Sequence, residues 1–208
     1  MRRAPFALIV ATLATATIFS SDPIAYTVSG PTWSQPQTPY FINTANLDLP
    51  GLPTETAVRA GADTWQQQSA AFRFVYTGFS TETTATNDGI NLVLFRNASS
   101  GSAIATTYWW SIGSRIVDAD IVFWDGAFQF FAGSSGCSGG FYIEDIAAHE
   151  FGHALGLGHS ASTSATMYPS VSSCNTGNRT LDADDIAGVR ALYPLHSLAP
   201  PAGVRIVP

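Results

Sequence analysis

The chain has 208 residues, of which 46% are hydrophobic, and a formal net charge of −6 at pH 7. This length is sufficient for one domain with a full core. All nine basic residues are arginine and the chain contains no basic patch, so nucleic acid is excluded as an expected partner.

Residues 1–25 have the composition of a secretory signal peptide. A basic start at Arg2 and Arg3 precedes an uncharged apolar run over residues 6–19, which is too short to span a membrane. Several small residues near the end of this segment leave the cleavage site open. We therefore expect a secreted, extracellular protein with no membrane span in its mature form, beginning with an extended leader or short pro-segment over residues 26–39.

The pattern of apolar residues over 40–195 predicts one α+β domain. Short alternating runs predict strands, at residues 40–43, 72–76, 90–95, 103–109 and 116–124. Longer runs with helical spacing predict helices, at residues 54–70 (with Thr54 as N-cap), 142–155 and 181–192. Residues 196–208 are expected to form a C-terminal tail.

The motif His-Glu-x-x-His-x-x-Gly-x-x-His begins at His149. Two histidines four residues apart lie on one face of a helix and can reach a single metal ion. Gly156 allows the turn that ends the helix and returns His159 as a third ligand. Three imidazoles and one open position are typical of catalytic zinc. The sequence therefore predicts one Zn²⁺ bound by His149, His153 and His159, with Glu150 as the general base.

The string Ala165-Thr166-Met167-Tyr168-Pro169 follows the third histidine closely. Together with the histidine motif it resembles the Met-turn of the metzincin zinc metalloproteases, in the form typical of the matrixins, the family of the matrix metalloproteinases. The resemblance runs from about residue 40 to residue 194. It implies a metzincin/matrixin-like catalytic domain with a twisted, mostly parallel five-stranded sheet and three helices. Pro169 stands where some metzincins have a tyrosine ligand, so three histidines are expected to bind the zinc.

The chain also departs from the better-known animal members of this family. No histidine precedes His149, and no cysteine precedes Cys137. A second, structural zinc site and a cysteine latch in a propeptide are therefore not expected, and neither is a haemopexin-like domain. We expect a minimal, bacterial-type form of the family.

The resemblance further implies where a substrate binds. The strand at residues 103–109 would be the sheet edge with which an extended protein or peptide substrate pairs. The loop after the Met-turn would line the pocket for the side chain that follows the cleaved bond. An ordinary edge strand and an ordinary loop are the alternatives. The contacts implied in this way are Ala103, Ala105 and Tyr108 on the strand, and Pro169, Ser170 and Val171 in the loop.

Cys137 and Cys174 are the two cysteines of the chain. In an exported protein they are most simply interpreted as one disulfide, although two buried thiols remain the alternative. This disulfide would close a loop that contains the zinc motif and the Met-turn. By loop entropy such a bond stabilises the fold by roughly 4 kcal/mol.

Asp118, Asp120 and Asp125 form an acidic cluster at the strand predicted over residues 116–124. Oxygen ligands at this spacing could hold Ca²⁺. Solvated residues at strand ends and turns are the alternative interpretation.

These features together predict a secreted, monomeric zinc endopeptidase that hydrolyses peptide bonds without a side-chain nucleophile. The alternative is a catalytically inactive binding or adhesion module that keeps the zinc fold. The presence of Glu150 argues against this alternative, because a decayed site would readily lose its base.

Overall fold

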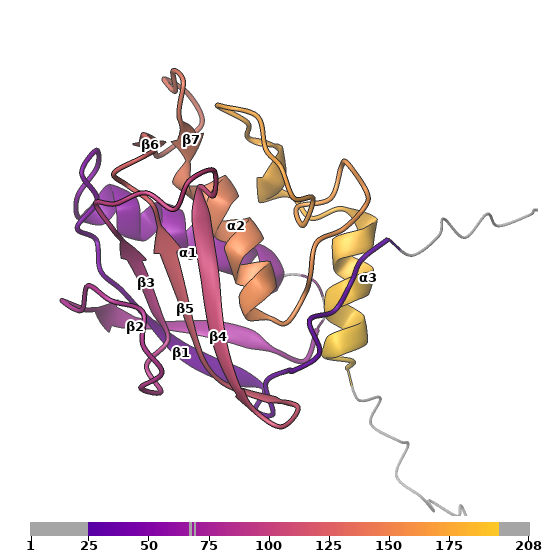
Figure 1. Ribbon diagram of the computed structural model, residues 1–208. Helices are drawn as coiled ribbons and strands as arrows, with labels where there is room; N and C mark the ends of the chain where they lie inside the picture. Colours follow the sequence, from indigo (N-terminus) through magenta and orange to yellow (C-terminus); the bar gives the residue numbers. More distant parts are fainter. Residues whose placement is uncertain (1–24, 67, 69, 196–208) are drawn as a thin grey trace, which may run out of the picture.

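The computed structural model describes residues 25–66, 68 and 70–195 (Figure 1). The expected signal peptide, apart from Ala25, and the expected tail from residue 196 lie outside the described residues. Within the described part of the chain, no helix is long and apolar enough to cross a membrane.

Five strands form the main sheet in the order β2-β1-β3-β5-β4. The pairs β1–β2, β1–β3 and β3–β5 are parallel, whereas β4 runs antiparallel to β5. This arrangement confirms the mostly parallel five-stranded sheet and places β4 at one edge. The strands are β1 (Gln37–Ile42), β2 (Arg73–Phe79), β3 (Leu92–Phe95), β4 (Ala105–Ile112) and β5 (Arg115–Phe123).

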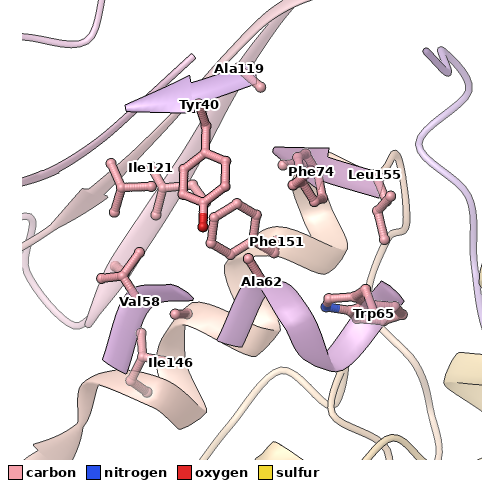
Figure 2. Close-up of a cluster of buried hydrophobic side chains, with 14 of the residues drawn as sticks. Tyr40, Val58, Ala62, Trp65, Phe74, Ala119, Ile121, Ile146, Phe151 and Leu155 are labelled. Carbon is pink, nitrogen blue, oxygen red and sulfur yellow. The ribbon is translucent and has the colours of Figure 1, made fainter. Parts of the chain in front are cut away.

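Three helices complete the α+β fold, as the resemblance implied: α1 (Leu52–Gln66), α2 (Ile143–Ala154) and α3 (Ala183–Leu192). The core lies between the sheet and the pair α1 and α2. In Figure 2, Tyr40 and Ile121 of the sheet point toward Ala62 of α1 and Phe151 of α2. The Trp65 indole Nε1 of α1 donates a hydrogen bond to the Ala148 carbonyl of α2, 2.7 Å away. The helix that carries the histidine motif is therefore fixed to the core.

Several details of the fold differ from the sequence-based expectation. Strand β1 begins at Gln37, inside the expected leader. Helix α1 begins at Leu52, so Thr54 lies in its first turn, where its hydroxyl donates to the Leu49 carbonyl. Short elements too brief to show a periodicity were not predicted; they are β6 (Phe130–Phe131), β7 (Phe141–Tyr142) and the 3₁₀ helix η1 (Gly177–Arg179).

The segment before β1 is extended and lies against the end of α2 and against α3. The backbone amides of Ala25 and Tyr26 donate to the Asp184 carboxylate at 2.8 and 2.9 Å. The Trp33 indole donates to the Ala154 carbonyl at 2.8 Å. This expected leader is thus joined to the domain by specific hydrogen bonds.

Candidate active site

Helix α2 places the first two histidines on its half-buried side. The opposite side is held in the core by apolar residues spaced three or four positions apart, namely Ile143, Ala147, Phe151 and Ala154. His149 and His153 are one helical turn apart, and their ring centroids are 4.7 Å from each other. The amphipathic pattern of the helix therefore aims both imidazoles out of the core.

The third histidine is returned by a turn at the end of α2. Gly156 has φ +99°, a conformation that residues with a side chain rarely adopt, and its carbonyl accepts a hydrogen bond from the Ser29 amide. Beyond this turn the ring of His159 lies 4.8 Å from that of His153 and 5.4 Å from that of His149, centroid to centroid. One ligand atom from each of the three histidines lies within 4.8 Å of the others.

Backbone carbonyls determine the tautomers of the two helical histidines. His149 Nδ1 lies 2.7 Å from the Thr166 carbonyl, and His153 Nδ1 lies 2.9 Å from the Leu157 carbonyl. A carbonyl can only accept, so each Nδ1 carries the proton. In a neutral imidazole the other nitrogen, Nε2, is then a bare lone pair, which is the form that binds a metal.

The two bare nitrogens face each other at short range. His149 Nε2 and His153 Nε2 are 3.1 Å apart. Burial lowers the pKa of His153, and the neighbouring His149 lowers it further, against the opposing effect of the Glu150 carboxylate. Burial also lowers the pKa of His159. Neutral rings with converging lone pairs repel one another unless a cation lies between them, so the donor set fits a metal ion.

The Met-turn lies beneath this site and is held by α3. Asp185 accepts hydrogen bonds from the backbone amides of Thr166 and Met167, at 2.7 and 3.0 Å. The carbonyl of Thr166 in turn faces His149 Nδ1. Asp185 also completes the capping box of α3, and its contact with the Met-turn joins residues about twenty positions apart. It therefore supports the imidazole of His149 through one peptide unit.

A cleft of about 740 Å³ opens beside the three histidines and Glu150. It lies between the edge strand β4 and the loop after the Met-turn, as the resemblance implied. Five of the six expected contact residues line it: Ala103, Ala105, Pro169, Ser170 and Val171. Phe128, Phe141, Ile146 and Trp109 add apolar surface to the same cleft.

The sixth expected contact residue, Tyr108, does not line the cleft. Its side chain is 40% exposed, and the neighbouring Trp109 lines the cleft instead. Successive side chains of a strand point to opposite faces. The apolar pattern identified the strand at residues 103–109 but did not determine which of its side chains face the cleft.

Glu150 is 5% exposed and also lines the cleft. Its carboxylate Oε2 lies 2.6 Å from the hydroxyl of Thr107 on β4, and the same hydroxyl is 3.0 Å from the Glu150 carbonyl. Thr107 was not among the expected site residues, because the two positions are 43 residues apart and no motif joins them.

Cys137 and Cys174 are joined by a disulfide, with their Cα atoms 5.5 Å apart. Close by, the Gly140 carbonyl accepts hydrogen bonds from the Cys174 amide and the Ser173 hydroxyl, at 2.9 and 3.1 Å. These bonds tie the loop after the Met-turn to the segment before β7. Both segments contribute to the cleft, through Val171 and Phe141.

The three aspartates of the possible calcium site are buried rather than solvated. Asp118 accepts hydrogen bonds from the amides of Asp88 and Gly89, and Asp120 from those of Thr86 and Leu92. Asp125 accepts from the Leu47 amide, in a different loop. Among the residues described, the three histidines are the one group of metal-ligating side chains that converges. The aspartates therefore hold loops, and calcium at this trio stays a prediction.

The chain was compared with known proteins. Its residues 32–194 match the family model described as Matrixin. It is 52% identical to neutrophil collagenase of Homo sapiens over 52 residues, which are 25% of this chain and 11% of the relative. It is 48% identical to the hatching enzyme of Paracentrotus lividus over 64 residues, 31% of this chain and 11% of the relative.

A plant protein is similar over a comparable stretch. The match to metalloendoproteinase 1 of Glycine max is 48% identical over 56 residues, 27% of this chain and 18% of the relative. The aligned stretches thus span less than a fifth of the length of these relatives. The family model, in contrast, matches nearly the whole of the described domain. The chain therefore belongs to the matrixin family of zinc-dependent metallopeptidases.

Proposed function

We propose that the protein is a secreted zinc endopeptidase that acts, as a monomer, on protein or peptide substrates outside the cell. The observation that carries this proposal is the convergence of three histidine ligand atoms within 4.8 Å of one another, beside a buried glutamate in a cleft. The family to which the chain belongs supports the same reaction.

The donor set favours zinc at this position. Three imidazole nitrogens without a fourth protein ligand are typical of catalytic zinc, whereas a structural site would be closed. His149 and His153 would bind through Nε2, because each Nδ1 donates to a backbone carbonyl. Bound there, zinc supplies a Lewis acid that polarises a peptide carbonyl and makes a water molecule more acidic.

Glu150 has the position of the general base. It is next in sequence to a ligand, is largely buried, and faces the same cleft as the histidines. Its carboxylate would accept a proton from the attacking water and return it to the leaving amine. The reaction then needs no nucleophilic side chain.

The substrate would lie as an extended strand along β4. This strand is at the edge of the sheet, so a peptide can pair with its free side by main-chain hydrogen bonds. The apolar residues Phe128, Phe141 and Val171 line the cleft and favour a hydrophobic side chain beside the cleaved bond.

Hydrolysis of casein and of a set of fluorogenic peptides by the purified zinc-loaded chain tests the proposal. We expect activity that a chelator abolishes and that zinc restores. Glu150→Ala should keep its zinc but lose at least a hundredfold in kcat, within the range of about 10²–10⁴ that a well-placed base contributes. Glu82→Ala, at an exposed loop residue, is the matched control and should retain full activity.

Zinc-loaded wild-type protein that hydrolyses none of these substrates would favour the alternative, an inactive binding module that keeps the fold. Glu150→Ala with more than about a tenth of wild-type activity would show that another group is the base.

A further inference from the structure

The carboxylate of Glu150 has one hydrogen-bond donor among the residues that the structure describes. This donor is the hydroxyl of Thr107, which lies 2.6 Å from Oε2. The hydroxyl has a single proton and two candidate acceptors, the carboxylate oxygen and the Glu150 carbonyl at 3.0 Å. A distance of 2.6 Å is typical of a hydroxyl that donates to a charged oxygen, so the proton goes to the carboxylate.

This hydrogen bond leaves the two carboxylate oxygens in different situations. Oε2 is held by Thr107, while Oε1 accepts no hydrogen bond from the described protein atoms. A glutamate side chain has several rotatable bonds and loses considerable rotamer freedom when it is fixed. The fold thus fixes one end of the carboxylate and leaves the other available to a molecule in the cleft.

Thr107 belongs to the same strand on which a substrate would lie. It is in β4 and pairs with Ile121 of β5, and it lines the cleft together with Ala105 and Trp109, two positions before and after it. A single rigid element therefore contacts the base and faces the proposed substrate. A small displacement between a base and its reacting group is enough to reduce a rate strongly.

We propose that Thr107 is a positioning residue for the peptidase reaction, a role that rests on the proposed function. Its hydroxyl holds Oε2 of Glu150 so that Oε1 is aimed at the attacking water. Because its hydroxyl donates to the carboxylate of the base, Thr107 contributes to kcat through Glu150 and leaves KM unchanged.

The test compares two substitutions at this position in the zinc-loaded enzyme. Thr107→Val has nearly the same shape but no hydroxyl, and kcat should fall about tenfold, part of what a well-placed base contributes, with KM within twofold. Thr107→Ser keeps the hydroxyl and should retain at least half of kcat. Thr77→Val makes the same change on β2, at the opposite edge of the sheet, and should leave both constants unchanged.

A second readout does not depend on activity. The melting temperature is measured for the wild type, Thr107→Val, Glu150→Ala and the double variant, all with zinc bound. The shift caused by Thr107→Val should be smaller when Glu150 is already absent, because the two residues interact directly. Zinc affinity, measured by chelator competition, should be the same for Thr107→Val and the wild type.

Three results would overturn the proposal: a kcat for Thr107→Val within twofold of the wild type, an equal loss in Thr107→Ser, or additive shifts in the melting temperatures. An equal loss in Thr107→Ser would assign the effect to packing of the methyl group. Absence of hydrolysis by the wild type would instead refute the proposed function, and the melting temperatures would still report on the contact.

Discussion

Gly152 of α2 is in close contact with Met167, and the Met-turn can pack against this helix only because residue 152 has no side chain. A Cβ atom at Gly152 would overlap with Met167 Sδ and would lie 2.7 Å from Trp65 Cζ2. Met167 is 1% exposed and Trp65 is 2% exposed. Both neighbours are enclosed by the core, so neither has room to move aside.

Gly152→Ala is expected to destabilise the protein, although alanine is normally the better helix former by about 1 kcal/mol. Overpacking of this kind costs roughly 1–3 kcal/mol, which outweighs the gain in helix propensity. Urea unfolding should show a lower midpoint for this variant. Gly177→Ala is the matched control, because a Cβ there meets only the Asn175 side chain, at 3.3 Å. An unchanged or raised midpoint for Gly152→Ala would contradict the packing argument.

One zinc ion per chain is expected in protein that has never met a chelator. His159 is the exposed member of the three ligands, so His159→Ala should fold normally yet lose most of its zinc during dialysis. Elemental analysis measures the zinc content of the wild type and of His159→Ala. Ser162→Ala, a few residues beyond the ligand, should bind zinc like the wild type. A wild-type content below half an equivalent would refute the three-histidine site.

The Cys137–Cys174 disulfide should stabilise the fold without inhibiting the proposed peptidase activity. The bond closes a loop with a sequence separation of 37 residues, for which loop entropy gives roughly 4 kcal/mol. We therefore expect reduction, or the double change of Cys137 and Cys174 to serine, to lower the melting temperature. Peptidase activity should fall or stay constant, because the bond joins two walls of the cleft. A gain of activity on reduction would mean that the disulfide restrains the enzyme.

Asp120 should make stability depend on pH. Burial raises the pKa of its carboxyl to about 7, against the opposing hydrogen bonds from the Thr86 and Leu92 amides. An aspartate in an unfolded chain titrates near ~4. Between these values the folded chain binds more protons than the unfolded chain. The contribution is therefore complete below about pH 4 and is lost as the pH rises to about 7, with a maximum loss of roughly 4 kcal/mol.

Urea unfolding from pH 5 to pH 8 measures this dependence. Asp120→Asn should be less stable than the wild type at pH 5, because the amide replaces one of two accepting oxygens with a donor. Its stability should nevertheless fall less steeply with pH. Equal slopes for the two proteins would assign the pH dependence to other carboxyls.

The convergence of the three histidines could be predicted from the sequence because their geometry is local. His149, His153 and Gly156 lie within three helical turns, and their spacing alone brings the histidines together. The five strands of the main sheet and the three α-helices were also predicted, because each carries a periodic apolar pattern. Where an element begins depends on its partners, and so Gln37 joins β1 only because it pairs with Arg73.

The supporting contacts could not be predicted, because they join residues far apart in the chain. Thr107 meets Glu150 only after β4 has paired with β5 and α2 has packed against the sheet. The hydrogen-bond partners of Asp118 could not be predicted either, because the amides of Asp88 and Gly89 reach its carboxylate only in the folded chain. The selection of Tyr108 instead of Trp109 is an error of one residue in strand register, which reverses the face of the sheet.

The hydrogen bonds that Asp185 accepts from the Met-turn have a consequence for the folding of the chain during its synthesis. The histidine motif leaves the ribosome well before α3. His149 Nδ1, however, is hydrogen-bonded to the carbonyl of Thr166, a residue whose backbone amide is held by Asp185 of α3. During synthesis α3 must therefore dock before the ring of His149 is fully supported. We expect chains that end before residue 183 to bind zinc weakly, so that the proposed peptidase activity would arise only after the final helix has emerged.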